Sequence, residues 1–255
     1  MALLRLQSGI VYGPVASRRL GCSLGLNILP FEYKLCSLNC VYCQYGWTKT
    51  CALDVRSYVS DLPTAEDVAL ALRASLLKLK DAGVAPSYIT FSGNGEPTLH
   101  PQFEEIVRAV KKVRDELAPG ASVAILSNST TVSEESVRRA LEQLDLRVMK
   151  LDCGEARTFG AYNRPCAGID FQRIVEGLRK LKGFSVQTLF TNLNSDESSV
   201  NNWIDALGTL KPNEVQVYTL DRSAPLAALR AVSKDKLEEI ARRVTSETGV
   251  PAQVY

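Results

Sequence analysis

The sequence predicts an α/β fold in which parallel strands alternate with helices, and three observations support this prediction. Six short apolar runs of β-type composition recur along the chain. Segments with helical periodicity lie between consecutive runs, and the connections are short. Strands that alternate with helices form βαβ units with right-handed crossovers, and such units build a parallel sheet. The chemistry is therefore expected at the carboxyl ends of the strands.

The individual elements follow from this alternation. The expected strands are residues 23–29, 88–92, 123–127, 148–151, 186–190 and 215–220. The expected helices are residues 65–79, 102–117, 134–144, 171–181, 198–210 and 234–245. Ser133 and Ser233 stand directly before two of these helices, where a serine caps the first turn. Six units are too few to close an eight-stranded barrel, so the periodicity fits either an open partial barrel or a doubly wound sheet.

The composition is that of a globular chain without low-complexity segments, since 45% of the 255 residues are hydrophobic and 23% are charged. No apolar run approaches the roughly 20 residues that cross a membrane. Arg5 interrupts the amino terminus too early for a secretory signal. We expect a single domain over residues 1–255. Seven cysteines, an odd number, argue against a disulfide framework and favour a reducing, cytoplasmic location.

Basic side chains exceed acidic ones in residues 1–60, which carry a local charge of +4 in a chain whose net charge is +2. The basic residues of this segment are Arg5, Arg18, Arg19, Lys34, Lys49 and Arg56. A solvated surface is the favoured interpretation. Alternatively, these charges surround a cysteine-rich loop and attract an acidic electron donor or a phosphate-bearing substrate. The chain has no long basic tract with interleaved aromatic residues, so support for nucleic-acid binding is weak.

Three cysteines, Cys36, Cys40 and Cys43, lie within eight residues, after the first expected strand. Clustered thiolates are soft ligands that select zinc or iron–sulfur clusters. A structural zinc site needs four ligands, and Cys51 or the sole histidine, His100, would have to complete it. The compact spacing departs from common zinc patterns and lacks the Cys-Pro ending of bacterial ferredoxins. An iron–sulfur cluster with one open iron is therefore favoured, and a zinc site is the alternative.

A glycine-rich turn follows the second expected strand. It consists of Ser92, Gly93, Asn94, Gly95, Glu96 and Pro97. Two glycines separated by one residue allow the backbone to approach a ligand closely, and the proline stops further strand pairing. The turn is neither a Walker loop, which needs a following Gly-Lys-Ser/Thr, nor a complete dinucleotide fingerprint. By itself it indicates no more than a tight connection between a strand and a helix.

Together the two segments resemble the radical S-adenosylmethionine (radical SAM) superfamily. The matching motifs are the Cys-x3-Cys-x2-Cys spacing, with Tyr42 before the last cysteine, and the Gly-x-Gly-Glu-Pro turn one βα unit later. The resemblance implies a partial (β/α)6 TIM-type barrel and a [4Fe–4S] cluster on Cys36, Cys40 and Cys43. S-adenosylmethionine (SAM) would chelate the fourth iron, with its adenine near Tyr42 and its methionine amino group on residues 92–97.

Four further segments resemble the stand-alone, wyosine-synthase-like iron–sulfur oxidoreductases of this superfamily. They are residues 13–21, 27–30, 91–101 and 218–222. The tRNA wyosine synthases have further upstream cysteines for a second cluster, whereas only Cys22 lies upstream here, so that activity is not carried over. The resemblance implies that a one-electron donor such as flavodoxin or ferredoxin reduces the cluster. SAM is then cleaved to a 5′-deoxyadenosyl radical, which abstracts hydrogen from an unidentified peptide, RNA or metabolite.

Polar residues at strand ends are further candidates for cofactor contacts. Asn128 follows the third expected strand and is a candidate for a ribose or carboxylate contact. Lys150 and Asp152 are expected on one face of their strand, where buried charges need a partner. They are interpreted with equal weight as a ligand site in the barrel lumen or as solvated residues beyond the strand end. The weaker lumen candidates are Gln187, Gln216 and Tyr218.

The remaining candidates are given structural roles. Arg164 is a possible carboxylate ligand with a surface position as the default, and His100 is expected to shape a helix entry. Small core or loop positions are expected for Cys22, Cys51, Cys153 and Cys166. Cys153 and Cys166 flank the same loop, so a redox or hydrogen-donating role is the alternative for these two. No residue is assigned a catalytic role. The functional alternative to a radical SAM enzyme is a non-catalytic zinc or iron–sulfur module that docks a partner.

Overall fold

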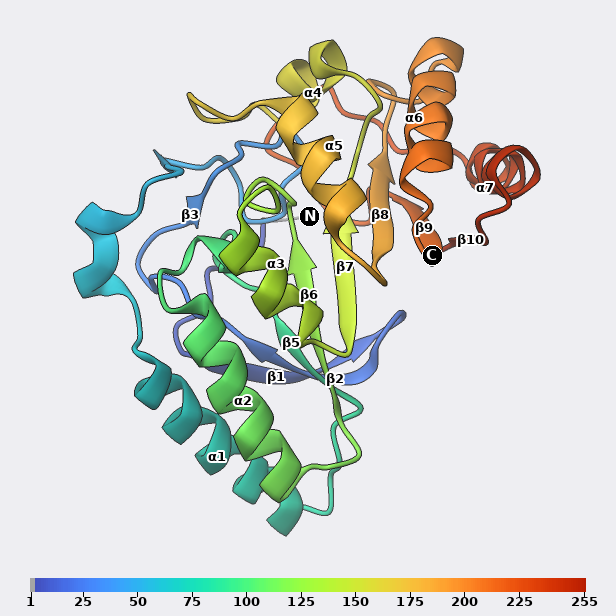
Figure 1. Ribbon diagram of the computed structural model, residues 1–255. Helices are drawn as coiled ribbons and strands as arrows, with labels where there is room; N and C mark the ends of the chain where they lie inside the picture. Colours follow the sequence, from blue (N-terminus) through green and yellow to red (C-terminus); the bar gives the residue numbers. More distant parts are fainter. Residues whose placement is uncertain (1–2) are drawn as a thin grey trace.

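The computed structural model describes residues 3–255 and shows an eight-stranded, curved sheet with helices along its outer side (Figure 1). In spatial order the strands are β1 (Val11–Ser17), β2 (Gly21–Leu26), β5 (Tyr88–Phe91), β6 (Ser122–Ser127), β7 (Leu146–Lys150), β8 (Ser185–Phe190), β9 (Glu214–Thr219) and β10 (Ala252–Val254). All neighbours pair in parallel except β1 and β2, which are antiparallel. The predicted α/β fold, a partial barrel of parallel strands, is confirmed, and the six predicted strands are β2 and β5 to β9.

The six predicted helices are also present. They are α1 (Ala65–Asp81), α2 (Phe103–Leu117), α3 (Glu135–Glu142), α5 (Phe171–Lys180), α6 (Glu197–Leu210) and α7 (Lys234–Thr248). A seventh helix, α4 (Ala156–Tyr162), was not predicted. Ser233 caps α7 by accepting a hydrogen bond from Lys236 N, as predicted. The predicted cap at Ser133 is wrong by one residue, because Glu134 occupies the cap position of α3. Within the described residues, no helix is long and apolar enough to cross a membrane.

Several short elements were not predicted. They are β1, β10, α4, a two-stranded parallel sheet of β3 (Leu35–Cys36) and β4 (Thr50–Cys51), and the 3-10 helices Arg56–Asp61 and Pro97–Leu99. Strand β1 contains Pro14, and its register shifts between Tyr12 and Val15. Proline and irregular pairing are tolerated at a sheet edge, where β1 lies. They interrupt the alternation of apolar and polar residues, so the strand is not detected from the sequence. The other strands are only two or three residues long, too short for periodicity to detect.

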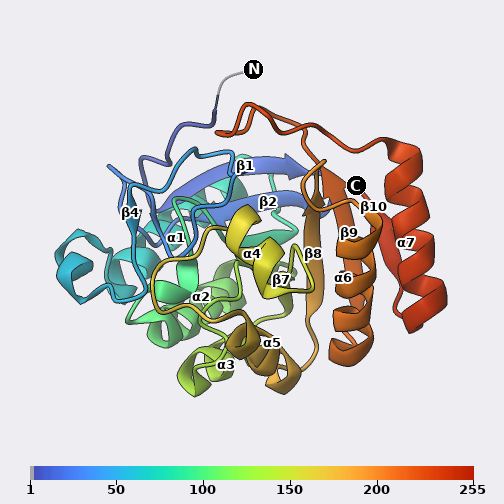
Figure 2. The same ribbon diagram turned by 90° about the horizontal axis from the view of Figure 1, so that it is seen from above.

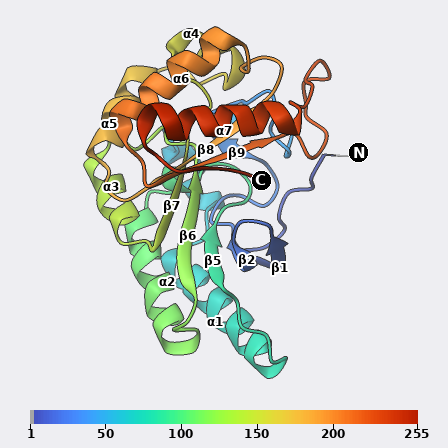
Figure 3. The same cartoon turned by 90° about the vertical axis from the view of Figure 1, so that its right-hand side faces the viewer.

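The helices cover one face of the curved sheet, and the other face lines a lumen. Figure 2 shows the strands as an arc with α2, α3, α5, α6 and α7 outside it, and Figure 3 shows α2, α3 and α5 on the side away from β1, with α7 crossing in front of β8 and β9. The main core lies between the two layers, where α2 buries an apolar stripe formed by Phe103, Ile106, Val107, Val110 and Val113. The lumen face is more polar, and there Gln187 Nε2 donates a hydrogen bond to Gln216 Oε1 at 3.1 Å.

The turn between β1 and β2 reaches the strands at the opposite edge of the sheet. Arg18 forms an exposed salt bridge of 3.2 Å with Asp221, which follows β9. Arg19 lies over the ring of Tyr218, 4.8 Å from its centroid, and 5.9 Å from the ring centroid of Tyr255. Side chains of this turn therefore bridge the lateral opening of the partial barrel.

Candidate metal centre and cofactor site

The first clustered cysteine lies on a short strand that joins the two sequence motifs. Cys36 ends β3 and is 8% exposed. Its neighbour Leu35 forms an isolated bridge with Gly95 of the glycine-rich turn. Two backbone hydrogen bonds hold this bridge, from Leu35 N to Asn94 O at 3.0 Å and from Glu96 N to Leu35 O at 3.2 Å. The cysteine loop and the glycine-rich turn are therefore in direct contact.

The glycines of the turn permit close packing against the protein itself. Gly95 has a φ of +147°, and a Cβ atom there would lie 1.6 Å from Leu35 O. Gly93 has a φ of +122°, and a Cβ atom there would lie 2.7 Å from Asn27 Oδ1. The sequence indicated an approach to a ligand, whereas the structure shows that backbone contacts within the chain already require both glycines.

Each of the three clustered thiols accepts one N–H hydrogen bond, and the three donors come from different parts of the chain. The pairs are Lys34 Nζ to Cys43 Sγ at 3.0 Å, Asn163 Nδ2 to Cys40 Sγ at 3.4 Å, and Asn128 Nδ2 to Cys36 Sγ at 3.5 Å. Hydrogen bonds to ligand sulfurs orient metal ligands and tune iron–sulfur clusters. The three thiols therefore already have partners of the kind that a cluster site requires.

Burial favours the protonated form of two of these thiols, Cys36 and Cys40. Loss of solvation raises the pKa of Cys36 to about 11 and the pKa of Cys40 to about 12. Burial by itself lowers the pKa of Lys34, but its electrostatic interactions and hydrogen bond with the cysteine loop outweigh burial, so this pKa is raised. The protons of Cys36 and Cys40 must therefore be displaced by the metal when it binds.

Neither residue considered as a fourth zinc ligand is free to bind a metal. Cys51 forms a disulfide with Cys166. His100 Nε2 lies 2.9 Å from Pro63 O, and His100 Nδ1 accepts a hydrogen bond from Gln102 N at 3.0 Å, at the entry to α2 as predicted. Among residues 3–255, no three His, Cys, Asp or Glu side chains converge on a single-ion site. The donor set is three free thiols, the number that leaves one iron of a four-iron cluster open.

The carboxylate of the glycine-rich turn is buried and hydrogen-bonded within the protein. Glu96 is 1% exposed and accepts hydrogen bonds from Thr98 N, from Ser127 Oγ at 2.9 Å and from Asn128 N at 2.5 Å. Burial raises the pKa of Glu96, and these hydrogen bonds partly offset the shift. Pro97, the next residue, begins the 3-10 helix that leads toward α2. Glu96 thus ties the turn to the end of β6.

The other polar side chains of the turn also have protein partners. Asn94 is fully buried, and its Nδ2 donates to Pro30 O at 2.8 Å while its Oδ1 accepts from Gln7 N at 2.7 Å. Ser92 Oγ lies 2.5 Å from Tyr12 Oη, and the Tyr12 ring packs against Gly25 of β2. Contacts between these side chains and a cofactor remain a prediction from the resemblance.

Lys150 and Asp152 form a buried ion pair at the end of β7, with 3.2 Å between Nζ and Oδ1. The Asp152 side chain is 1% exposed and the Lys150 side chain 18% exposed. Asp152 also accepts hydrogen bonds from Tyr42 Oη, from Asn163 Nδ2 at 2.8 Å and from Leu189 N at 3.0 Å. The interpretation of this pair as solvated residues beyond the strand end is therefore wrong.

This network connects the lumen to the cysteine loop. Lys150 Nζ donates to Tyr218 Oη at 2.9 Å, and Asn163 contacts both Asp152 and Cys40 Sγ. Burial lowers the pKa of Lys150, but the nearby Asp152 carboxylate outweighs it, so this pKa is raised. Lys150 is therefore a cation at neutral pH, although it is largely withdrawn from water.

The comparison with known families bears on this arrangement. A sequence profile described as the radical SAM superfamily matches residues 33–194, which include the cysteine loop, the glycine-rich turn and the Lys150–Asp152 pair. The chain belongs to the radical SAM superfamily. Membership implies a SAM-dependent enzyme with a [4Fe–4S] cluster.

Two curated relatives of this radical SAM chain have similar identities but very different lengths. A UPF0026 protein of Synechocystis sp. is 30% identical over 271 residues, covering 95% of this chain and 95% of that protein. A protein named GTPase Obg in Brachyspira hyodysenteriae is 30% identical over 241 residues, covering 92% of this chain but 33% of that protein. The chain therefore spans about a third of the length of the second relative and nearly the whole length of the first.

Solved structures share the radical SAM fold at low sequence identity. A radical SAM methyltransferase from Sphaerobacter thermophilus superposes with a TM-score of 0.66 at 14% identity, covering 91% of this chain and 66% of that one. TYW1 with a lysine-pyruvate adduct bound gives 0.60 at 13% identity, covering 90% and 76%. Streptococcus suis SuiB bound to S-adenosylmethionine gives 0.61 at 14% identity, covering 89% and 51%. These matches support the assignment of the fold as a radical SAM partial barrel.

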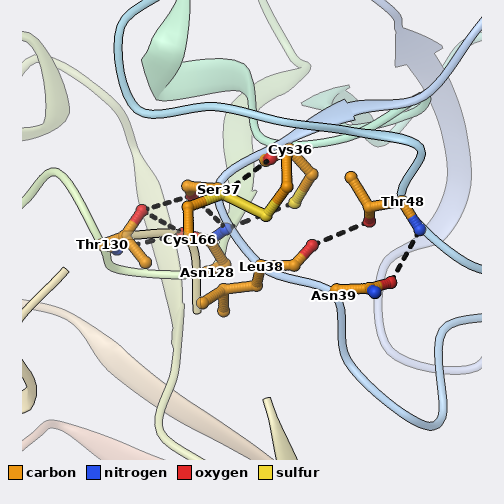
Figure 4. The surroundings of a disulfide bond; sticks show 9 residues. Cys36, Ser37, Leu38, Asn39, Thr48, Asn128, Thr130 and Cys166 are labelled. Atoms are coloured by element: carbon orange, nitrogen blue, oxygen red, sulfur yellow. Dashed lines mark hydrogen bonds between the residues drawn. A yellow bond between two sulfur atoms is a disulfide. The ribbon is translucent and has the colours of Figure 1, made fainter. Parts of the chain in front are cut away.

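A disulfide lies directly against the cysteine loop (Figure 4). It joins Cys51 on β4 to Cys166 between α4 and α5, with the two Cα atoms 5.7 Å apart. Cys166 N donates to Ser37 O at 3.0 Å, and Ala52 N donates to Cys36 O at 3.1 Å. Cys51 and Cys166 were expected to be small core or loop residues, whereas the structure pairs them, because the fold brings together residues separated by 115 positions. The free thiols are Cys22, Cys36, Cys40, Cys43 and Cys153.

Replacing Cys51 with serine is expected to lower the free energy of unfolding of the metal-free protein by about 2–5 kcal/mol, because the bond closes a long loop. Urea unfolding without reductant measures this change. Cys166→Ser should give the same loss, and a reductant should lower the wild type to the level of either variant. Cys22→Ser, which alters a free thiol, is the control. A wild-type unfolding curve that does not respond to reductant would contradict the bond.

Two of the residues that contact the clustered thiols, Lys34 and Asn163, were not expected there from the sequence. Lys34 was counted only among the surplus basic residues, although its place two positions before Cys36 was a usable signal. Asn163 stands beside Arg164, which was singled out but instead lies over the Trp47 ring, 4.9 Å from its centroid. No sequence signal distinguishes Asn163 from Arg164, because the end of α4 decides which side chain points inward.

Proposed function

We propose that this protein is a radical SAM enzyme in which Cys36, Cys40 and Cys43 hold a [4Fe–4S] cluster. When bound, the cluster and SAM supply one-electron chemistry, in which reductive cleavage of the sulfonium gives methionine and a 5′-deoxyadenosyl radical that abstracts hydrogen from a substrate. The observation that carries the proposal is the set of three free, hydrogen-bonded thiols beside the glycine-rich turn, with both candidate fourth ligands already engaged.

The side chains around these thiols would bind and orient the cofactor. Residues 92–97 would hold the methionine end of SAM, and Tyr42, fixed by its hydrogen bond to Asp152, would pack against the adenine. Asn128 and the Lys150–Asp152 pair present polar groups toward the same side of the barrel. Because these groups are buried or partly buried, they would also exclude water from the reacting centre.

We propose a one-electron donor protein such as flavodoxin or ferredoxin, and a cytoplasmic location. The positive charge of residues 1–60 suits an acidic donor, and the clustered thiols must be reduced to bind iron. The substrate would be a peptide, an RNA or a metabolite that reaches the lumen past the turn between β1 and β2.

Anaerobic reconstitution with iron and sulfide tests the proposal. The wild type is expected to bind about four irons and four sulfides and to form 5′-deoxyadenosine when dithionite and SAM are added. Cys36→Ala, Cys40→Ala and Cys43→Ala should each lose both properties, whereas Cys22→Ala, a matched change at a free thiol away from the loop, should retain them. A colourless protein that binds zinc and no cluster would instead support the non-catalytic module.

A further inference from the structure

Lys34 occupies an unusual position for a lysine. It is 6% exposed, and its Nζ lies 3.0 Å from Cys43 Sγ and 3.0 Å from Gly46 O. In the chain from residue 3 to residue 255, no carboxylate forms an ion pair with it. An unpaired ammonium group is costly to bury, so some other negative charge must stabilise it.

Once the clustered cysteines bind a metal as thiolates, they would supply this charge. Lys34 Nζ donates a hydrogen bond to Cys43 Sγ, and Lys34 lies two residues before Cys36 in the chain. The other two thiols accept hydrogen bonds from the neutral amides of Asn128 and Asn163. Within the described chain, Lys34 is therefore the one formal positive charge that hydrogen-bonds to a clustered sulfur.

We propose that Lys34 is a positioning residue that raises the reduction potential of the cluster by placing a cation against the Cys43 ligand. This inference rests on the proposed function, since it needs a cluster on Cys36, Cys40 and Cys43. Reduction adds one electron, and hence one negative charge, to the cluster. A cation 3.0 Å from a ligand sulfur, in a site shielded from water, stabilises the more negative state. Lys34 thus eases electron transfer from the donor.

Two simpler roles for Lys34 make different predictions. If Lys34 only fixes the turn at Gly46 through its second hydrogen bond, removing its charge changes stability and leaves the potential unchanged. If it binds the carboxylate of SAM, removing it weakens SAM binding and leaves the potential without SAM unchanged. A redox titration without SAM therefore separates the proposed role from both.

The experiment is a dithionite titration of the anaerobically reconstituted protein with redox mediators, followed by electron paramagnetic resonance of the reduced cluster. For Lys34→Met, the equilibrium constant for reduction is expected to fall about tenfold or more, a downward shift of about 59 mV or more for a one-electron couple. Lys34→Arg, which keeps the charge, should change the equilibrium constant for reduction less than threefold. Lys49→Met is the matched control, because it removes an exposed lysine of the same loop with the same change in net charge.

A change of less than twofold for Lys34→Met at wild-type iron content would overturn the inference. If Lys34→Met does not retain a cluster, Lys34→Gln, which keeps a hydrogen-bond donor without the charge, is titrated in its place. If both variants lose a cluster that Lys34→Arg retains, the role is assembly rather than tuning, and the inference is also rejected. Failure of the wild type itself to bind a cluster would reject the proposed function instead.

Discussion

Replacing Gly95 with alanine is expected to displace the cysteine loop from the glycine-rich turn and to lower the free energy of unfolding by about 3 kcal/mol or more. The new Cβ atom would lie 1.6 Å from Leu35 O and 2.5 Å from Leu35 C. No side-chain rotation relieves these contacts, because both atoms belong to the backbone. A φ of +147° also strains an alanine at this position.

Urea unfolding of the metal-free protein measures this loss, and iron content after reconstitution measures its consequence for Cys36. Gly120→Ala is the matched control, since nothing lies within 4 Å of its Cβ position. There we expect no loss of stability and at most a gain of about 1 kcal/mol. Wild-type stability and full iron content in Gly95→Ala would show that the Leu35–Gly95 bridge does not organise the site.

Asp152→Ala is expected to lower the free energy of unfolding by about 3–5 kcal/mol, because it leaves a buried lysine without its partner. Lys150 would lose the carboxylate at 3.2 Å, and Leu189 N would lose its acceptor at 3.0 Å. Tyr42 and Asn163 would also lose their shared acceptor. Because Asn163 contacts Cys40 Sγ as well, we expect a reduced iron content in addition to the loss of stability.

Asp221→Ala provides the control for Asp152, because it removes an aspartate from an exposed salt bridge with Arg18. Exposed pairs contribute less than about 1 kcal/mol, so little change is expected there. Adding Lys150→Met to Asp152→Ala should recover part of the loss by removing the unpaired charge. Equal losses at the two aspartates, measured by urea unfolding, would contradict the burial argument.

Periodicity predicted the regular part of the fold well. Strands β2 and β5 to β9 and the long helices carry continuous apolar patterns. An element needs such a pattern to bury one face in any fold, so the pattern can be detected without knowing the fold. Elements of two or three residues, such as β3 and β10, have no pattern to detect, since their pairing depends on neighbours distant in sequence. The open barrel could not be separated from a doubly wound sheet by periodicity, because both use the same βαβ units.

The site was predictable to the extent that its chemistry is encoded in local spacing. Three thiols within eight residues indicate a metal centre from residue types alone, whereas the resemblance of both motifs to the radical SAM superfamily implied its cofactor. The pairing of Cys51 with Cys166 has no local signal, because loop closure over 115 residues is decided by the fold. For Lys150 and Asp152, the sequence supported a buried and a solvated position equally, because it does not show where β7 ends relative to the lumen.

By itself, the sequence determined the α/β class, the three candidate cluster ligands and the glycine-rich turn, since each depends on residues close together in the chain. Only the tertiary structure decided that Lys34, Asn128 and Asn163 each donate to a different cysteine. It also decided that Asp152 accepts hydrogen bonds from three separate segments of the chain. The physical reason is that hydrogen bonds and ion pairs depend on distance in space. That distance is set when the helices and strands pack together, and not by the order of residues along the chain.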